Sequence, residues 1–129
     1  MLPRKHFLVT FFICIPLFLV YQWWVLLILA SAVLIDVDHY IHYVFKFKKF
    51  NLKKAYNYYL NRDNNKKREK LLFVFHTWEV LSIILILGFF FQIFWLIFLG
   101  FFIHVLEDIY DYYTRVKIYS RRISLFFDM

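Results

Sequence analysis

Residues 7–35 read FLVTFFICIPLFLVYQWWVLLILASAVLI and contain no charged side chain over 29 positions. A second uncharged stretch covers residues 80–103 and is 24 residues long. A helix needs about 20 predominantly apolar residues to cross the ~30 Å hydrocarbon core of a bilayer. Apolar residues make up 63% of the 129-residue chain, against the ~45–50% usual for soluble domains. These features predict an integral membrane protein with a single domain, residues 1–129.

Each apolar stretch is interpreted as a helical hairpin. One helix over residues 7–35 would be about 43 Å long, which exceeds the thickness of the hydrocarbon core. A break near Gln22 shortens it, because amide and aromatic side chains favour the membrane interface. The predicted fold class is therefore all-α, an integral membrane four-helix bundle of two hairpins, although hydropathy alone also accepts two single spans. The predicted helices cover about 4–21, 23–45, 71–91 and 93–110, with a cytoplasmic segment at 46–70 and a tail at 112–129.

The basic residues support the hairpins. All sixteen lie before the first helix, between Lys46 and Lys70, or between Arg115 and Arg122. With hairpins they share one side of the membrane, which the positive-inside rule makes cytoplasmic. This predicts a multi-pass protein of the cytoplasmic (inner) membrane with both termini in the cytoplasm. A cleaved signal peptide is disfavoured, because the first apolar stretch is longer than the ~7–15 residues of a signal-peptide core.

The segment between the hairpins is predicted to contain a short amphipathic helix. Asn51 is its candidate N-cap. The expected apolar stripe is Leu52, Ala55, Tyr56, Tyr59 and Leu60, opposite Lys53, Lys54 and Asn57. Such a helix lies in the bilayer interface with its lysines directed toward anionic lipid headgroups. Residues 61–69 are polar and are expected to form a loop. Because membrane topology already explains the basic residues, no nucleic-acid partner is expected.

Ionisable side chains gather at one end of the apolar helices. Eleven of the fourteen histidines and carboxylates lie there: His6, Asp36, Asp38, His39, His42, His76, Glu79, His104, Glu107, Asp108 and Asp111. At membrane depth each costs ~2.5–3.5 kcal/mol, so a cluster needs compensating partners. Counted from the expected turn of their own hairpin, at position 22 or 92, His6, Asp38, His76 and Asp108 are each sixteen residues away. All four therefore lie about 24 Å from the turns, in one layer near the cytoplasmic interface.

The spacing of these residues predicts a metal site. At spacings i, i+3, i+4 and i+7, one face of the last helix carries His104, Glu107, Asp108 and Asp111. Imidazoles mixed with carboxylates on facing helices suit a divalent ion, with Zn as the first choice and Mn or Fe as alternatives. The predicted ligands are His6, Asp38, His39, His76, His104 and Asp108. Asp36 or Glu79 is then the candidate general base.

Simpler interpretations remain open for several of these residues. His6 follows two basic residues and could be an interfacial cation. His42 could end its helix, and Glu107 and Asp111 could solvate a helix end. His76 could instead form a hydrogen-bonded pair with Glu79 inside the bundle.

The motifs resemble those of a known family. A D-x-D-H motif stands at Asp36-Val37-Asp38-His39, a histidine beside a threonine at His76-Thr77, and G-x3-H-x3-D at Gly100, His104 and Asp108. With His6 near the N-terminus, the pattern resembles the YdjM-type membrane-bound metal-dependent hydrolases over roughly residues 4 to 112. The ligand types are also similar to those of zinc-dependent phospholipase C. The resemblance implies a metal-dependent hydrolase.

The chain departs from that family pattern at two places. Ile35 stands where a proline usually precedes the first aspartate. Residues 75–79, Phe-His-Thr-Trp-Glu, lack the arginine, the glycine and one histidine of an H-R-G-x-T-H-S run. Glu79 could replace the missing ligand, because it lies one turn beyond His76.

The predicted function is hydrolysis of a phosphoester or similar bond in a lipid-like substrate at the cytoplasmic interface. An alternative of another class is a non-catalytic metal or proton handler, or a site that only staples the bundle. Haem ligation is disfavoured, because a haem iron needs few carboxylates. The tip halves of the helices carry almost no polar residues, which favours an interfacial site over a conduit. The sequence leaves open whether the protein is an enzyme.

Overall fold

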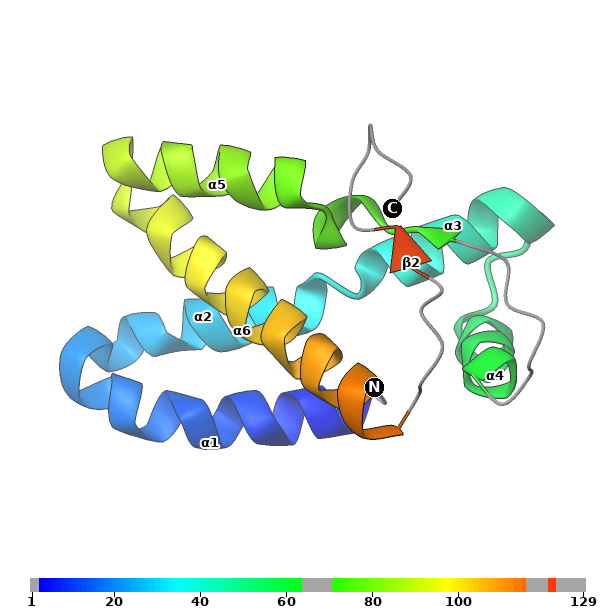
Figure 1. Cartoon of the computed structure of the whole chain (residues 1–129), viewed down its shortest axis with the longest axis horizontal. Helices are drawn as coiled ribbons and strands as arrows, with labels where there is room; N and C mark the ends of the chain where they lie inside the picture. Colours follow the sequence, from blue (N-terminus) through cyan, green and yellow to red (C-terminus); the bar gives the residue numbers. More distant parts are fainter. Residues whose placement is uncertain (1–2, 64–70, 116–120, 123–129) are drawn as a thin grey trace.

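The computed structural model describes residues 3–63, 71–115 and 121–122 and is almost wholly helical (Figure 1). The elements in chain order are α1 (Pro3–Tyr21), η1 (Gln22–Trp24), α2 (Val25–Leu34), α3 (Val37–Phe47), α4 (Leu52–Asp63), β1 (Leu71–Leu72), η2 (Val74–His76), α5 (Trp78–Phe90), α6 (Gln92–Arg115) and β2 (Arg121–Arg122). The two short strands β1 and β2 pair in parallel. The predicted all-α class is therefore confirmed.

The first hairpin is formed by α1 and α2, which run antiparallel (Figure 1). They join at η1, where Gln22 has a φ of 48° in the left-handed region. The predicted break near Gln22 is therefore confirmed. Cys14 of α1 and Ile28 of α2 pack with Leu96 of α6 in a buried apolar core. This core fixes the first hairpin against the helix of the second hairpin that crosses it.

The predicted helix over residues 23–45 is divided into α2 and α3 by a turn at Ile35-Asp36. In an unbroken helix Asp36 and Asp38 would point to nearly opposite sides, because each residue turns the helix by about 100°. The turn instead lets both carboxylates reach the same imidazole. His39 Nδ1 lies 2.9 Å from Asp38 Oδ1 and 3.4 Å from Asp36 Oδ1. Both carboxylates therefore lie close to His39 at the junction of α2 and α3.

The predicted helix over residues 71–91 is wrong at its start, because α5 begins only at Trp78. Before it, polar groups hold the backbone in the tighter turn η2. Asp38 Oδ2 accepts a hydrogen bond from the Phe75 N–H at 3.2 Å. The Thr77 hydroxyl donates to the Val74 carbonyl at 2.8 Å. Such local bonds compete with helix formation, so His76 lies in a turn and not on a helix shared with Glu79.

The predicted short amphipathic helix is present as α4, and its predicted cap is confirmed, since the Lys54 N–H donates to Asn51 Oδ1 at 2.9 Å. α4 runs to Asp63 and so includes the start of the predicted loop at 61–69. Residues 64–70 lie outside the described part of the chain. α6 continues to Arg115, into the predicted tail. Of the remaining tail, only residues 121–122 are described.

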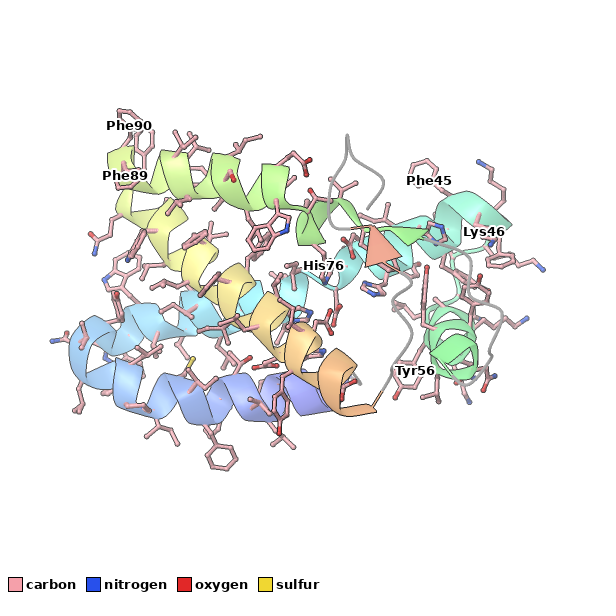
Figure 2. The ribbon with its side chains drawn as sticks, in the orientation of Figure 1. Phe45, Lys46, Tyr56, His76, Phe89 and Phe90 are labelled. Carbon is pink, nitrogen blue, oxygen red and sulfur yellow. The ribbon has the colours of Figure 1, made fainter. Side chains whose placement is uncertain are left out.

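Two helical stretches are long and apolar enough to cross a membrane, His6–Phe47 and Gln92–Asp111. The first includes the turn at η1, and the second is most of α6. The remaining apolar helix, α5, is shorter. Large apolar side chains are exposed along the outside of these helices and at the hairpin turns, where Figure 2 labels Phe89 and Phe90. The outer surface of the helical part is thus predominantly apolar.

The helix α6 packs tightly against α2 at Gly100. A Cβ atom at this position would collide with the Ser31 hydroxyl and the Ile28 carbonyl of α2. One turn further along α6, His104 reaches the carbonyl oxygen of Ala32. Because Gly100 has no side chain, α6 can lie close enough to α2 for His104 to reach the Ala32 carbonyl.

We expect Gly100→Ala to lower the thermal midpoint of the detergent-purified protein, because overpacking a tight contact typically costs ~1–3 kcal/mol. Gly88→Ala is the matched control, since the nearest atoms to its Cβ are the Trp95 backbone atoms at 3.1 Å. Alanine also favours helix there by about 1 kcal/mol. Equal midpoints for the two variants would contradict the tight contact at Gly100.

Candidate metal centre

Four separate segments bring five ionisable side chains together where α1 begins and α2 ends, away from the hairpin turns. His6 comes from α1, Asp36 from the α2–α3 turn, His76 from η2, and His104 and Asp108 from α6. We call these five residues the inner cluster. Figure 2 shows His76 between α6 and the α2–α3 turn, where nitrogen and oxygen atoms gather. Two overlapping groups, His6 with His104 and Asp108, and Asp36 with His76 and His104, each have ligand atoms within 4.8 Å of one another.

The His104 ring is held by the backbone of α2. Its Nδ1–H donates to the Ala32 carbonyl oxygen at 2.7 Å, which leaves the lone pair on Nε2. This nitrogen is buried without a hydrogen-bond partner among the described residues. It faces two carboxylates, Asp36 Oδ1 at 3.5 Å and Asp108 Oδ2 at 3.9 Å. A lone pair directed at two carboxylates is unfavourable, and either protonation of Nε2 or a cation between the three groups removes the repulsion.

The His6 ring is held by a carboxylate. His6 Nδ1 donates to Glu107 Oε2 at 2.7 Å, and Glu107 Oε1 accepts the Thr10 hydroxyl at 2.8 Å. The other ring nitrogen, Nε2, is 3.2 Å from Asp108 Oδ1. The His6 ring also stacks on His104 with 4.1 Å between ring centroids. Glu107 and Thr10 therefore turn the Nε2 atom of His6 toward the same carboxylate that His104 faces.

The His76 ring follows the same arrangement. Its Nδ1 donates to Asp38 Oδ2 at 3.1 Å, and its Nε2 is 3.8 Å from both Asp36 Oδ1 and Asp108 Oδ2. The second oxygen of Asp38 accepts from His39 Nδ1 at 2.9 Å. Both oxygens of Asp38 are thus engaged with imidazoles. This geometry suits a positioning carboxylate better than a direct metal ligand.

The predicted ligands are distributed over two adjoining groups. His6, His76, His104 and Asp108 belong to the inner cluster, together with Asp36. The other group consists of Asp38 and His39 together with His76, and it adjoins the inner cluster through His76. Their assignment as ligands stays a prediction.

Three other candidates lie outside these groups. Glu79 is in the first turn of α5, and Asp111 is one turn beyond Asp108 on α6. The His42 ring makes a 2.6 Å hydrogen bond with the Tyr59 hydroxyl of α4.

Sequence reasoning gave too little weight to the groups that orient the imidazoles. From the sequence, Glu107 is compatible with a residue that solvates a helix end as well as with a site residue. Thr10 carries no charge and does not stand out. A backbone carbonyl such as that of Ala32 leaves no signal in a sequence. One signal was available, because Thr10 follows His6 by four residues and therefore shares its helix face.

The donor atoms fit a divalent ion. Three imidazole nitrogens and the carboxylates of Asp36 and Asp108 offer only nitrogen and oxygen, which Zn, Mn and Fe accept. With neutral imidazoles the inner cluster carries two negative charges, which one divalent ion balances. Cys14 is no part of it, because its side chain lies in the apolar core with Val25 and Ile28.

Comparison with known proteins found no matching protein family, no similar curated protein and no similar solved structure. The family resemblance drawn from the motifs therefore stays a prediction. What the structure itself supplies is the geometry of the inner cluster.

We expect Glu107→Gln to weaken Zn binding by about 10- to 100-fold, the usual effect of losing a carboxylate that orients a ligating histidine. The measurement is competition with a chelator in detergent. Asp111→Asn is the control, one turn further along α6 and outside the inner cluster. An equal loss of affinity in both variants would argue for a general charge effect and against orientation of His6.

Proposed function

We propose that this chain is a multi-pass protein of the cytoplasmic membrane, with a divalent-metal centre built from the inner cluster. The metal is Zn in the first instance, with Mn or Fe as alternatives. The proposed activity is hydrolysis of a phosphoester or similar bond in a lipid-like substrate at the cytoplasmic interface.

The distribution of side chains along the molecule supports the membrane placement. Exposed aromatic residues lie at both hairpin turns, Trp23 and Trp24 at one and Phe89 and Phe90 at the other. Both turns lie at the same end of the molecule (Figure 1), and aromatic side chains favour a membrane interface. The described basic residues on and between α3 and α4 lie further from the turns than the inner cluster (Figure 1). The inner cluster is about 18–24 Å along the helices from the turns, near the proposed cytoplasmic side.

The irregular segment before α5 is compatible with this depth. Non-helical backbone is tolerated in a bilayer only where protein or water satisfies its polar groups. Phe73, His76 and Thr77 are buried inside the protein. The N–H groups of His76 and Thr77 donate to the carbonyls of Phe73 and Val74. The segment therefore needs no contact with lipid.

One observation carries the proposal of a metal centre. In His6, His76 and His104, Nδ1 is committed to an acceptor, while Nε2 faces Asp108 in His6 and both Asp36 and Asp108 in His76 and His104. Metal-ligating histidines characteristically bind an acceptor through the nitrogen that does not face the ion. Three independent repeats of this arrangement, from three different elements, support a common cation.

The residues around the centre support a hydrolytic role. A divalent ion held here would polarise a scissile phosphoester and lower the pKa of water toward ~7. Asp36 has the most exposed side chain of the inner cluster, at 23%, so the cluster opens to its surroundings at this carboxylate. Asp36 is therefore our first choice for accepting a proton from the attacking water. Glu79, at the start of α5, is the second choice.

A purely structural metal site is the competing proposal, and the burial of the ligands favours it. The side chains of His6 and His104 are 2% and 0% exposed. Structural metal sites are closed, whereas catalytic ones keep a position open to substrate or water. The exposed edge at Asp36 is what favours catalysis over a staple.

We expect His104→Gln to lower bound metal at least about tenfold and to reduce the thermal midpoint, because a lost ligand leaves buried carboxylates uncompensated. Elemental analysis of detergent-purified protein measures the metal. His42→Gln removes an imidazole outside the inner cluster and should retain the metal. Unchanged metal content in His104→Gln would refute the centre.

We expect Asp36→Asn to reduce hydrolysis of a short-chain phospholipid by ~10²-fold or more if Asp36 is the general base. Metal content and hydrolysis are measured on the same preparation. Glu79→Gln is compared in parallel, and a selective loss of activity there would transfer the role to Glu79. A metal-loaded wild-type protein without activity on any phosphoester would leave only the structural site.

A further inference from the structure

The helix α4 divides into three faces instead of the two expected from its sequence. Ala55 is buried against α3, with Tyr58 and Tyr59 half-buried beside it. Leu52, Tyr56 and Leu60 repeat at i, i+4 and i+8 and are 67%, 43% and 36% exposed. This set, which we call the α4 stripe, is separate from the face that contacts α3. It is an apolar surface that the described part of the chain leaves uncovered.

Exposed lysines lie on α4, at the end of α3 and between these two helices. Lys46, Lys48, Lys49, Lys53 and Lys54 are all exposed. No acidic residue stands between His39 and Arg62 in the sequence, and Asp63 is the last residue of α4. Figure 2 shows Lys46 and Phe45 together at the end of α3, and Tyr56 on α4. Exposed apolar side chains next to lysines are typical of helices that lie in an anionic membrane interface.

Direct contacts of Tyr59 place α4 beside the part of α3 that adjoins the inner cluster. Tyr59 of α4 binds His42 and meets the ring of His39 edge-on, with 5.2 Å between centroids. The Phe73 ring stacks on the His39 ring, with 3.8 Å between the two centroids. His39 in turn lies 3.4 Å from Asp36 Oδ1, the carboxylate at which the inner cluster opens.

We propose that the α4 stripe and its lysines bind the headgroup region of anionic phospholipids and gather these lipids beside the opening of the metal centre. This rests on the membrane location proposed above, and it makes an anionic amphiphile the substrate class. The stripe inserts among the first carbons of the acyl chains. The lysines contact the phosphates, and α3 with Tyr59 holds α4 at a fixed place next to His39 and Asp36.

The test uses the full chain, one copy per nanodisc, with a bimane fluorophore on a single cysteine in a Cys14→Ala background. The label is placed at Leu60→Cys in the α4 stripe or, as the matched control, at Asn57→Cys on the polar face. Quenching by doxyl-labelled lipid is compared between discs of phosphatidylcholine and discs containing phosphatidylglycerol. Metal content is measured on the same discs, so that failure of the metal centre is detected separately.

We expect quenching at position 60 to be roughly twofold greater in the anionic discs, because lysines are attracted to a negative surface. High salt should reduce the difference by screening, and Lys53→Gln with Lys54→Gln should remove most of it. Position 57 should be quenched weakly in both lipids. Equal quenching at position 60 in both lipids, or none in either, overturns the proposal. Quenching that appears only with two chains per disc would assign the α4 stripe to a second copy and also overturn it.

Discussion

Neutralisation of buried carboxylates is the constraint on which the rest of this structure depends. Asp38 and Glu107 are buried and Asp108 is nearly so, and an uncompensated charge in such a place costs several kcal/mol. Each lies against an imidazole from another part of the chain. That requirement draws α1, α6, η2 and the α2–α3 turn to one point. The interrupted second helix and the late start of α5 are local consequences of the same requirement.

The positions of the imidazoles are set by the packing of the helices. α6 approaches α2 closely because Gly100 has no side chain, and one turn later His104 donates to a carbonyl of α2. The lone pair of His104 therefore takes its direction from the backbone. His6 and His76 take theirs from carboxylates, Glu107 and Asp38. A site oriented in this way is rigid before any ion binds, which is the condition for selective coordination.

The sequence was sufficient to predict the two hairpins and the polar layer, because apolar length and residue counts along helices are both local quantities. Counting from the turns placed His6 and Asp108 at one depth, and their side chains lie 3.2 Å apart. The start of α5 was not predictable, since residues 71–75 are as apolar as a helix. The Asp38 carboxylate accepts a hydrogen bond from the Phe75 N–H, 37 residues later in the chain, within the turn that precedes α5. Spacing alone also could not separate Asp108, which faces the centre, from Glu107, which orients His6.

The separation of the cluster along the chain has a consequence for biogenesis. His6 and Glu107 are 101 residues apart, so they meet only after the chain has been synthesised as far as α6. Until then the newly made first hairpin holds His6, Asp36 and Asp38 without their partners from α6 and η2. Contacts between distant segments form late, because loop closure must precede them. The contacts among these polar side chains therefore form late in assembly, after both hairpins have been made.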